Sequence, residues 1–271
     1  MDSHRGGRAS GRAGMATRAT GSVARRSSAL ALVGSMLVLG PTSAGPPLVT
    51  DDPDVTPRHH VEISIPYELE VDIGGTQMYL PQIDASYGLT SELELSTAGG
   101  VMRARPAGGL PSVGMSDLAV GLKWRVAQSA RHGVQVSVSS EVTFPSGDAA
   151  LGLGQGGLGV DLSLMAGRQF GDTTVYLHLG YETFPTVALT NHFFAGLAVD
   201  QPVGSRLHLL GEVYGNQFNE PTERGGRGQL LWNVGAAYEF DDGDSALLFS
   251  IGRAFRGDPS TTVYIGPQIT F

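Results

Sequence analysis

The chain lacks cysteine, contains a single lysine, Lys123, and has no long hydrophobic run. Without cysteine, disulfides and thiolate metal sites are excluded, which is compatible with passage through an oxidising compartment. The apolar run Ala29–Leu39 has eleven residues, too short for a transmembrane helix of about 20 residues. The 39 glycines scattered along the chain argue against helices generally.

The N-terminal region has the features of an export signal. Arg25 and Arg26 precede the apolar run, and the small residues 42–44 precede Gly45. Basic residues, a short apolar run and a small-residue cleavage site are typical of a secretory signal that is removed. We therefore expect a signal peptide at 1–44, a periplasmic N-terminal segment at 45–59 and a folded domain at 60–271.

Positive charge is scarce after the predicted signal. Taking the six Arg and one Asp of residues 1–44 from the 18 basic and 26 acidic residues of the whole sequence leaves 12 and 25, a net charge near −13. A chain this acidic has no electrostatic footprint for nucleic acid, which we exclude as a partner.

Apolar and polar residues alternate along most of the chain, as in strands with two chemically different faces. For example, Val134, Val136 and Val138 alternate with Gln135 and Ser137. Twelve such segments are predicted, at 60–71, 76–87, 92–101, 115–126, 133–144, 157–170, 173–183, 191–201, 206–217, 229–240, 245–256 and 261–271. An even strand number is what a bacterial outer-membrane barrel requires when both termini lie in the periplasm.

The connections and the aromatic residues also fit a barrel. Short connections alternate with longer ones at 102–114, 145–156, 184–190 and 218–228, although two on the longer side are short, at 72–75 and 257–260. Outward rings are expected near one end at Tyr87, Trp124, Phe170, Tyr238, Phe240 and Phe271, and near the other at Phe144, Tyr181 and Phe255. Short periplasmic turns, longer outer loops and two aromatic girdles are typical of these barrels.

The final segment, TTVYIGPQITF, places Val263, Ile265, Ile269 and Phe271 on one face. It resembles the C-terminal assembly signal of bacterial outer-membrane β-barrels. We therefore expect an all-β protein, an antiparallel transmembrane β-barrel of about 12 strands over 60–271 in the bacterial outer membrane, preceded by a cleavable signal peptide. The expected partners are outer-membrane lipid, the barrel-assembly machinery through the strand ending in Phe271, and small solutes. The alternative is a soluble, exported β-sandwich or lipocalin-like barrel.

The polar face of the predicted strands is rich in charged residues. Its predicted pore-lining members are Glu68, Asp84, Glu94, Asp117, Lys123, Arg125, Glu141, Asp161, Glu182, Glu212 and Glu239. Isolated buried carboxylates are costly, so this lining implies water or paired partners. One interpretation is a hydrated, cation-favouring pore whose constriction includes Lys123 and Arg125. The other is an internal salt-bridge network that stiffens a closed barrel.

Catalytic and metal signatures are weak. His178 and His208 are expected to point inward, where they cannot meet a lipid substrate as a lipid-modifying enzyme would require. The adjacent His59 and His60 would point to opposite sides of a strand, a poor arrangement for a metal. The glycine-rich run 151–159 lacks the Lys-Ser/Thr and helix of a phosphate loop. We predict no catalytic residue, cofactor or metal, and hence a protein that is not an enzyme.

Several stretches resemble a known family. They are GPPLVTDDPD, HHVEISIPYE, LPQIDASYGLTSELEL, MSDLAVGLKWRV, EVTFPSGDAALGLGQGGLGV and VYIGPQITF, which together span most of 45–271. The chain resembles the outer-membrane "transporter" barrels of the MetA-pathway of phenol degradation. That resemblance implies an exported barrel that passes hydrophobic or aromatic compounds. The expected function is thus an outer-membrane channel or transporter for small solutes. The alternatives are a lipid-modifying enzyme using a residue such as His178, or a closed structural barrel that displays its loops.

Overall fold

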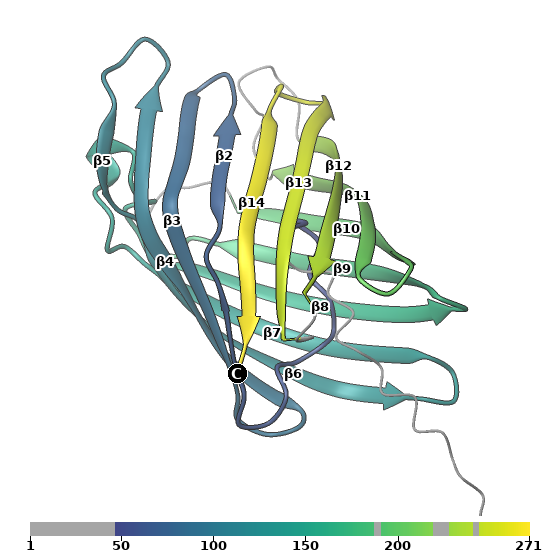
Figure 1. Ribbon diagram of the computed structural model, residues 1–271. Helices are drawn as coiled ribbons and strands as arrows, with labels where there is room; N and C mark the ends of the chain where they lie inside the picture. The colour runs from purple at the N-terminus through teal and green to yellow at the C-terminus, as the bar shows by residue number, and fades with distance from the viewer. Residues whose placement is uncertain (1–46, 187–190, 219–227, 241–243) are drawn as a thin grey trace, which may run out of the picture. The chain divides into compact units, whose positions relative to one another are not determined.

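The structure is a computed structural model that describes residues 47–186, 191–218, 228–240 and 244–271 (Figure 1). The predicted signal peptide, 1–44, lies outside these residues, and all of them belong to one compact unit, Leu39–Phe271. The strands are β1 (Val61–Ser64), β2 (Tyr67–Val71), β3 (Gly75–Gly88), β4 (Leu93–Pro106), β5 (Ser112–Met115), β6 (Leu118–Ser129), β7 (Val134–Phe144), β8 (Gly159–Phe170), β9 (Thr173–Thr183), β10 (His192–Val203), β11 (Leu207–Phe218), β12 (Gly228–Glu239), β13 (Ser245–Arg256) and β14 (Thr261–Thr270), with one 3₁₀ helix, η1 (Ala149–Leu151). In these ranges no helix has the length and apolar character needed to cross a membrane.

The fourteen labelled strands make twelve wall strands. β1 and β2 are parts of one wall strand interrupted at residues 65–66, because both pair with β14 and with β3. β5 and β6 are likewise parts of one strand interrupted at residues 116–117, and both pair with β4. All other neighbours in sequence pair antiparallel. The predicted all-β fold and the predicted strand number are therefore confirmed.

The first and last strands close the barrel. Val61 N–H donates to the Phe271 carbonyl at 3.2 Å, and Phe271 N–H donates to the Val61 carbonyl at 2.8 Å. Nearby, the side-chain amide of Gln268 donates to the Glu62 carboxylate at 2.7 Å. Pairing at this seam joins the two ends of the sheet, which is what a strand-built protein needs inside a bilayer.

One predicted loop is shorter than expected. β4 continues to Pro106 and β5 begins at Ser112, so most of the predicted loop 102–114 is a hairpin whose tip is 107–111. The alternation is reversed there, because the inward residues Met102 and Ala104 are apolar and the intervening Arg103 and Arg105 are charged. Met102 and Ala104 are buried under Leu153, which comes from the connection between β7 and β8. A reversed alternation does not continue the apolar-outward pattern by which the first part of the strand was recognised.

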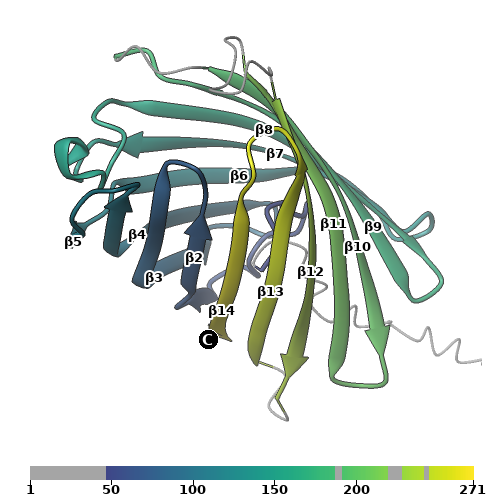
Figure 2. The same cartoon turned by 90° about the horizontal axis from the view of Figure 1, so that it is seen from above.

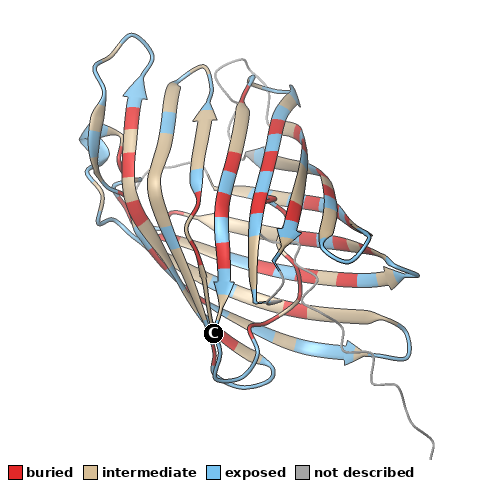
Figure 3. Cartoon of the chain, viewed as in Figure 1, coloured by how far each residue is buried: buried red, intermediate tan, exposed pale blue. Residues whose placement is uncertain are grey.

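The two faces of the wall differ as the alternation predicts (Figure 3). Along β11, Leu209 is 48% exposed and faces outward while Leu210 is 5% exposed and faces inward. Eight of the predicted interfacial rings are exposed, namely Tyr87, Trp124, Phe144, Phe170, Tyr238, Phe240, Phe255 and Phe271. Because a wide apolar belt around a closed barrel suits lipid and not water, the fold favours the membrane over the soluble alternative.

Candidate functional site

Residues 47–57, here called the inner segment, precede β1 and run along the inside of the barrel wall. Figure 2 shows this purple stretch within the ring of strands. Its first contacts are with the late strands. The Ser250 hydroxyl of β13 donates to the Pro47 carbonyl at 2.6 Å. The N–H groups of Val49 and Thr50 donate to the Glu212 carboxylate of β11 at 2.9 and 2.7 Å.

The later residues of the inner segment contact progressively earlier strands. Asp51 N–H donates to His178 Nδ1 of β9 at 3.1 Å, and the Ser137 hydroxyl of β7 donates to the Pro53 carbonyl. The N–H and hydroxyl of Thr56 donate to the Glu94 carboxylate of β4 at 2.6 and 3.0 Å. The inner segment therefore crosses the wall strands from β13 back to β4 and lines much of the interior.

Glycines on the inner face make room for the inner segment. A Cβ atom at Gly196 of β10 would overlap the Thr50 hydroxyl, and one at Gly167 of β8 would lie 3.0 Å from Pro53 Cγ. At these positions the absence of a side chain lets two backbones approach closely. The predicted periplasmic N-terminal segment at 45–59 includes these residues, and the prediction did not anticipate their contacts with the inner wall.

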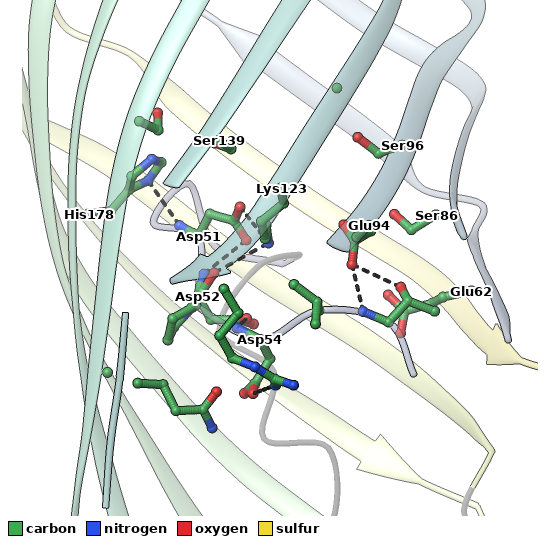
Figure 4. Close-up of a pocket in the computed structure, with 18 of the residues that line it drawn as sticks. Asp51, Asp52, Asp54, Glu62, Ser86, Glu94, Ser96, Lys123, Ser139 and His178 are labelled. Atoms are coloured by element: carbon green, nitrogen blue, oxygen red, sulfur yellow. Dashed lines mark hydrogen bonds and ion pairs between the residues drawn. The ribbon is translucent and has the colours of Figure 1, made fainter. Parts of the chain in front are cut away.

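Both cationic residues predicted at the constriction contact the inner segment; Figure 4 shows Lys123 beside Asp51 and Asp52. Lys123 Nζ lies 2.9 Å from Asp51 Oδ2 and donates to the Asp52 carbonyl at 3.3 Å. Arg125 Nη1 lies 4.0 Å from Asp54 Oδ1. The inner segment thus supplies carboxylates that neutralise the two positive charges of the wall.

The interior has an apolar side and a polar side. On strands β9–β14, the inward residues Tyr176, Ala198, Leu210, Ala237, Leu248 and Tyr264 form a buried cluster with Leu48 of the inner segment. This cluster fills the lumen on that side. The open space consequently lies off-centre, towards the opposite wall.

That open space is a cavity of about 900 Å³, lined mainly by the inner segment and by strands β1, β3, β4 and β6–β9. Its walls carry many hydroxyl groups, including those of Ser86, Ser96 and Ser139 (Figure 4). Nine carboxylate residues line it against two cationic ones, Lys123 and Arg125. A cavity lined with one sign of charge concentrates ions of the opposite sign, so it attracts cations.

Three carboxylate residues are neighbours on adjacent strands, and the first two of them, Glu141 and Asp161, line the cavity. Glu141 of β7 is the direct cross-strand partner of Asp161 of β8, and Asp161 is the partner of Glu182 of β9. Glu182 pairs with His192 of β10 at 3.3 Å. Among the residues that the structure describes, no Lys or Arg forms an ion pair with Glu141 or Asp161. Like charges placed directly opposite are destabilising, so their presence requires an explanation other than stability.

The structure distributes the predicted pore-lining residues among several environments. Six of them line the cavity, namely Asp84, Glu94, Lys123, Arg125, Glu141 and Asp161. Glu212 is 5% exposed and holds the inner segment. Asp117 accepts bonds from the backbone N–H groups of Gly147 and Gln155, and so anchors the loop between β7 and β8. Glu68 is the cross-strand partner of Tyr264, and Glu239 lies 3.5 Å from His208. Their role in a pore stays a prediction.

The candidate histidines have structural partners. His178 is buried inside the barrel, and its Nδ1 accepts the Asp51 N–H. His208 Nδ1 lies 2.9 Å from Asp200 Oδ1. Neither ring faces the lipid side, where a lipid-modifying enzyme would meet its substrate. In the described part of the chain, no group of three or more His, Asp or Glu is arranged to hold a metal ion.

A closed antiparallel sheet with an apolar outside and a polar, partly open inside defines a transmembrane β-barrel of the outer-membrane class. Solved structures agree with this class. The KdgM porin matches with a TM-score of 0.53 and 14% identity over 77% of this chain and 99% of that one. The KdgM porin in complex with disordered oligogalacturonate matches with a TM-score of 0.54 and 13% identity over 77% of this chain and 99% of that one. The NanC porin matches with a TM-score of 0.57 and 9% identity over 76% of this chain and 98% of that one.

These likenesses show the fold. No protein-family model matches the chain, and no curated protein sequence matches it either. The resemblance to the MetA-pathway barrels therefore stays a prediction. The chain is a closed antiparallel β-barrel with the fold of porins. That it is not an enzyme also stays a prediction.

Proposed function

We propose that the protein is an outer-membrane channel for small polar solutes and cations, which pass through the off-centre cavity. The observation that carries this proposal is the excess of carboxylates over cationic side chains in the cavity lining. Because Lys123 and Arg125 are already engaged by the inner segment, the carboxyl groups of Glu141 and Asp161 are available as ligands for mobile cations.

The charged groups of the lining are the basis for proposing polar solutes and cations. The MetA-pathway resemblance predicts hydrophobic or aromatic compounds, but the cavity walls are rich in serine hydroxyls and carboxylates. Carboxylates and hydroxyls offer partners to polar solutes and cations, while apolar residues such as Val49, Tyr176 and Phe194 share the same lining. Oligogalacturonate, named with one of the similar structures, is an oligomer of a sugar acid, and the negative lining argues against it as a solute here.

The test is conductance of the refolded protein in a planar bilayer under a salt gradient. We expect discrete openings with a reversal potential that favours cations. Refolding is verified beforehand by the mobility shift that a folded barrel shows on heating. A folded barrel that does not conduct would refute the proposal and favour the closed structural barrel. A reversal potential that favours anions would refute the proposed cation preference.

We also propose that outer-membrane lipid surrounds the apolar belt and that the assembly machinery recognises the last strand. The Phe271 ring is exposed on the outside, while its backbone pairs with Val61 at the seam. Replacing Phe271 with Ala keeps the backbone bonds and removes only the ring. We expect this variant to reach the membrane in lower yield but to refold normally in detergent. An equal membrane yield would contradict recognition through Phe271.

A further inference from the structure

The inner segment is attached to the wall mainly through its backbone. Backbone groups of Pro47, Val49, Thr50, Asp51 and Pro53 form the hydrogen bonds described above. Side chains of the same segment line the cavity, including Val49, which is 43% exposed. An extended chain fixed by its backbone presents some of its side chains to the space in front of it.

The attachment is too extensive for a loosely held plug. Thr50, Asp52 and Thr56 are buried, and Glu212 and Glu94 are each the acceptor of two hydrogen bonds from the segment. Hydrogen bonds to a charged group are stronger than those between neutral groups. Withdrawal of the segment would leave two buried carboxylates without these donors.

We propose that the inner segment is a fixed constriction of the channel, in which Val49 limits the free width and Asp54 contributes to the charge preference. This inference rests on the proposed channel function. It assigns selectivity to residues that precede the first strand, in addition to the wall. The segment stays in place while solutes pass.

The first test locks the segment to the wall. The ideal Cβ position at Gly196 lies 3.1 Å from Thr50 Cβ, close to the roughly 3.5–4.5 Å of a disulfide. The chain has no cysteine of its own, so the pair Thr50→Cys and Gly196→Cys allows one intramolecular disulfide, and each single variant serves as a control for disulfides between molecules. We expect the disulfide to form under mild oxidation and the oxidised and reduced channels to conduct alike. Failure to form it, or a channel that opens only after reduction, would overturn the proposal.

The second test changes the width at Val49. Trp presents a much larger side chain than Val, so Val49→Trp should lower the single-channel conductance to about half or less, whereas Val49→Ala should raise it. Val213→Trp is the matched control, because Val213 is an exposed outward residue of β11. Equal conductance of Val49→Trp and Val213→Trp would overturn the assignment of the constriction.

The third test addresses charge. Asp54→Asn should reduce the cation preference measured from the reversal potential, whereas Asp172→Asn, in the exposed turn after β8, should not. An unchanged preference in Asp54→Asn would overturn the role of this carboxylate. If wild-type protein conducts and the three tests fail, only the constriction is refuted. If neither the folded wild type nor any folded variant conducts, the channel itself is refuted. Formation of the disulfide would then show only that the segment lies against the wall.

Discussion

Replacing Glu141, Asp161 and Glu182 with Gln, Asn and Gln should remove most of the channel's preference for cations. The three carboxylates are consecutive cross-strand partners, and no Lys or Arg among the described residues pairs with the first two. One unit charge about 4 Å from an ion contributes ~1 kcal/mol in water, about a fivefold change in local ion concentration. We therefore expect the cation-to-anion permeability ratio to fall by about fivefold or more, as measured by reversal potentials.

A matched pair of single variants separates this effect from general charge loss. Asp161→Asn removes a charge from the cavity wall, and Asp172→Asn removes the same charge from an exposed turn. Only the former should lower the permeability ratio. Stability gives a second readout, because removing adjacent like charges should raise the urea midpoint. A lower midpoint with an unchanged permeability ratio would favour the internal salt-bridge network over the pore.

Replacing Lys123 with Met should destabilise the barrel by about 1–3 kcal/mol. The variant keeps a long side chain but loses the ion pair with Asp51 and the bond to the Asp52 carbonyl. Removing one member of a fully buried pair costs about 3–5 kcal/mol. The loss is smaller here because the Asp51 side chain is 35% exposed and water partly compensates its charge, although that of Lys123 is only 13% exposed.

The measurement is the urea midpoint of the folded form, followed on unheated gels. Lys123→Arg keeps the charge and should stay near the wild type. The double variant Lys123→Met with Asp51→Asn should recover part of the loss, because it no longer leaves a carboxylate without its partner. A single Lys123→Met variant as stable as the wild type would contradict a structural role for this ion pair.

The wall of the barrel could be predicted from sequence because alternation is a local property. In β7, for example, Val134, Val136 and Val138 lie on one side, so the strand's own sequence shows which face is apolar. The predicted boundaries fail where that pattern is interrupted. At Met102 and Ala104 the inward side chains are apolar, and they pack against Leu153, which is distant in sequence. Such contacts depend on the closed fold and leave no local signal.

The inner segment was missed for a related reason. Residues 47–57 have no period, and their partners are far away in sequence, with Pro47 and Ser250 separated by 203 positions. The inward direction of Lys123 and Glu212 was predictable, but their partners were not. One available signal was the proline at positions 47, 53 and 57. Prolines at such intervals favour an extended, non-helical chain that cannot pair as a central strand.

The position of the inner segment has a consequence for the order of assembly. Its contacts with β11 and β13 cannot form until those late strands have joined the sheet, and the seam between Val61 and Phe271 joins the two ends of the barrel wall. The seam and the segment's contacts both join residues far apart in sequence, so loop closure does not order them. The segment needs the inner faces of β11 and β13 as its binding surface, and we therefore expect it to be seated only after the wall has formed. A newly closed barrel would then be wider and leakier than the mature one, and it would reach its final permeability only when its own N-terminal residues have settled against the inner glycines.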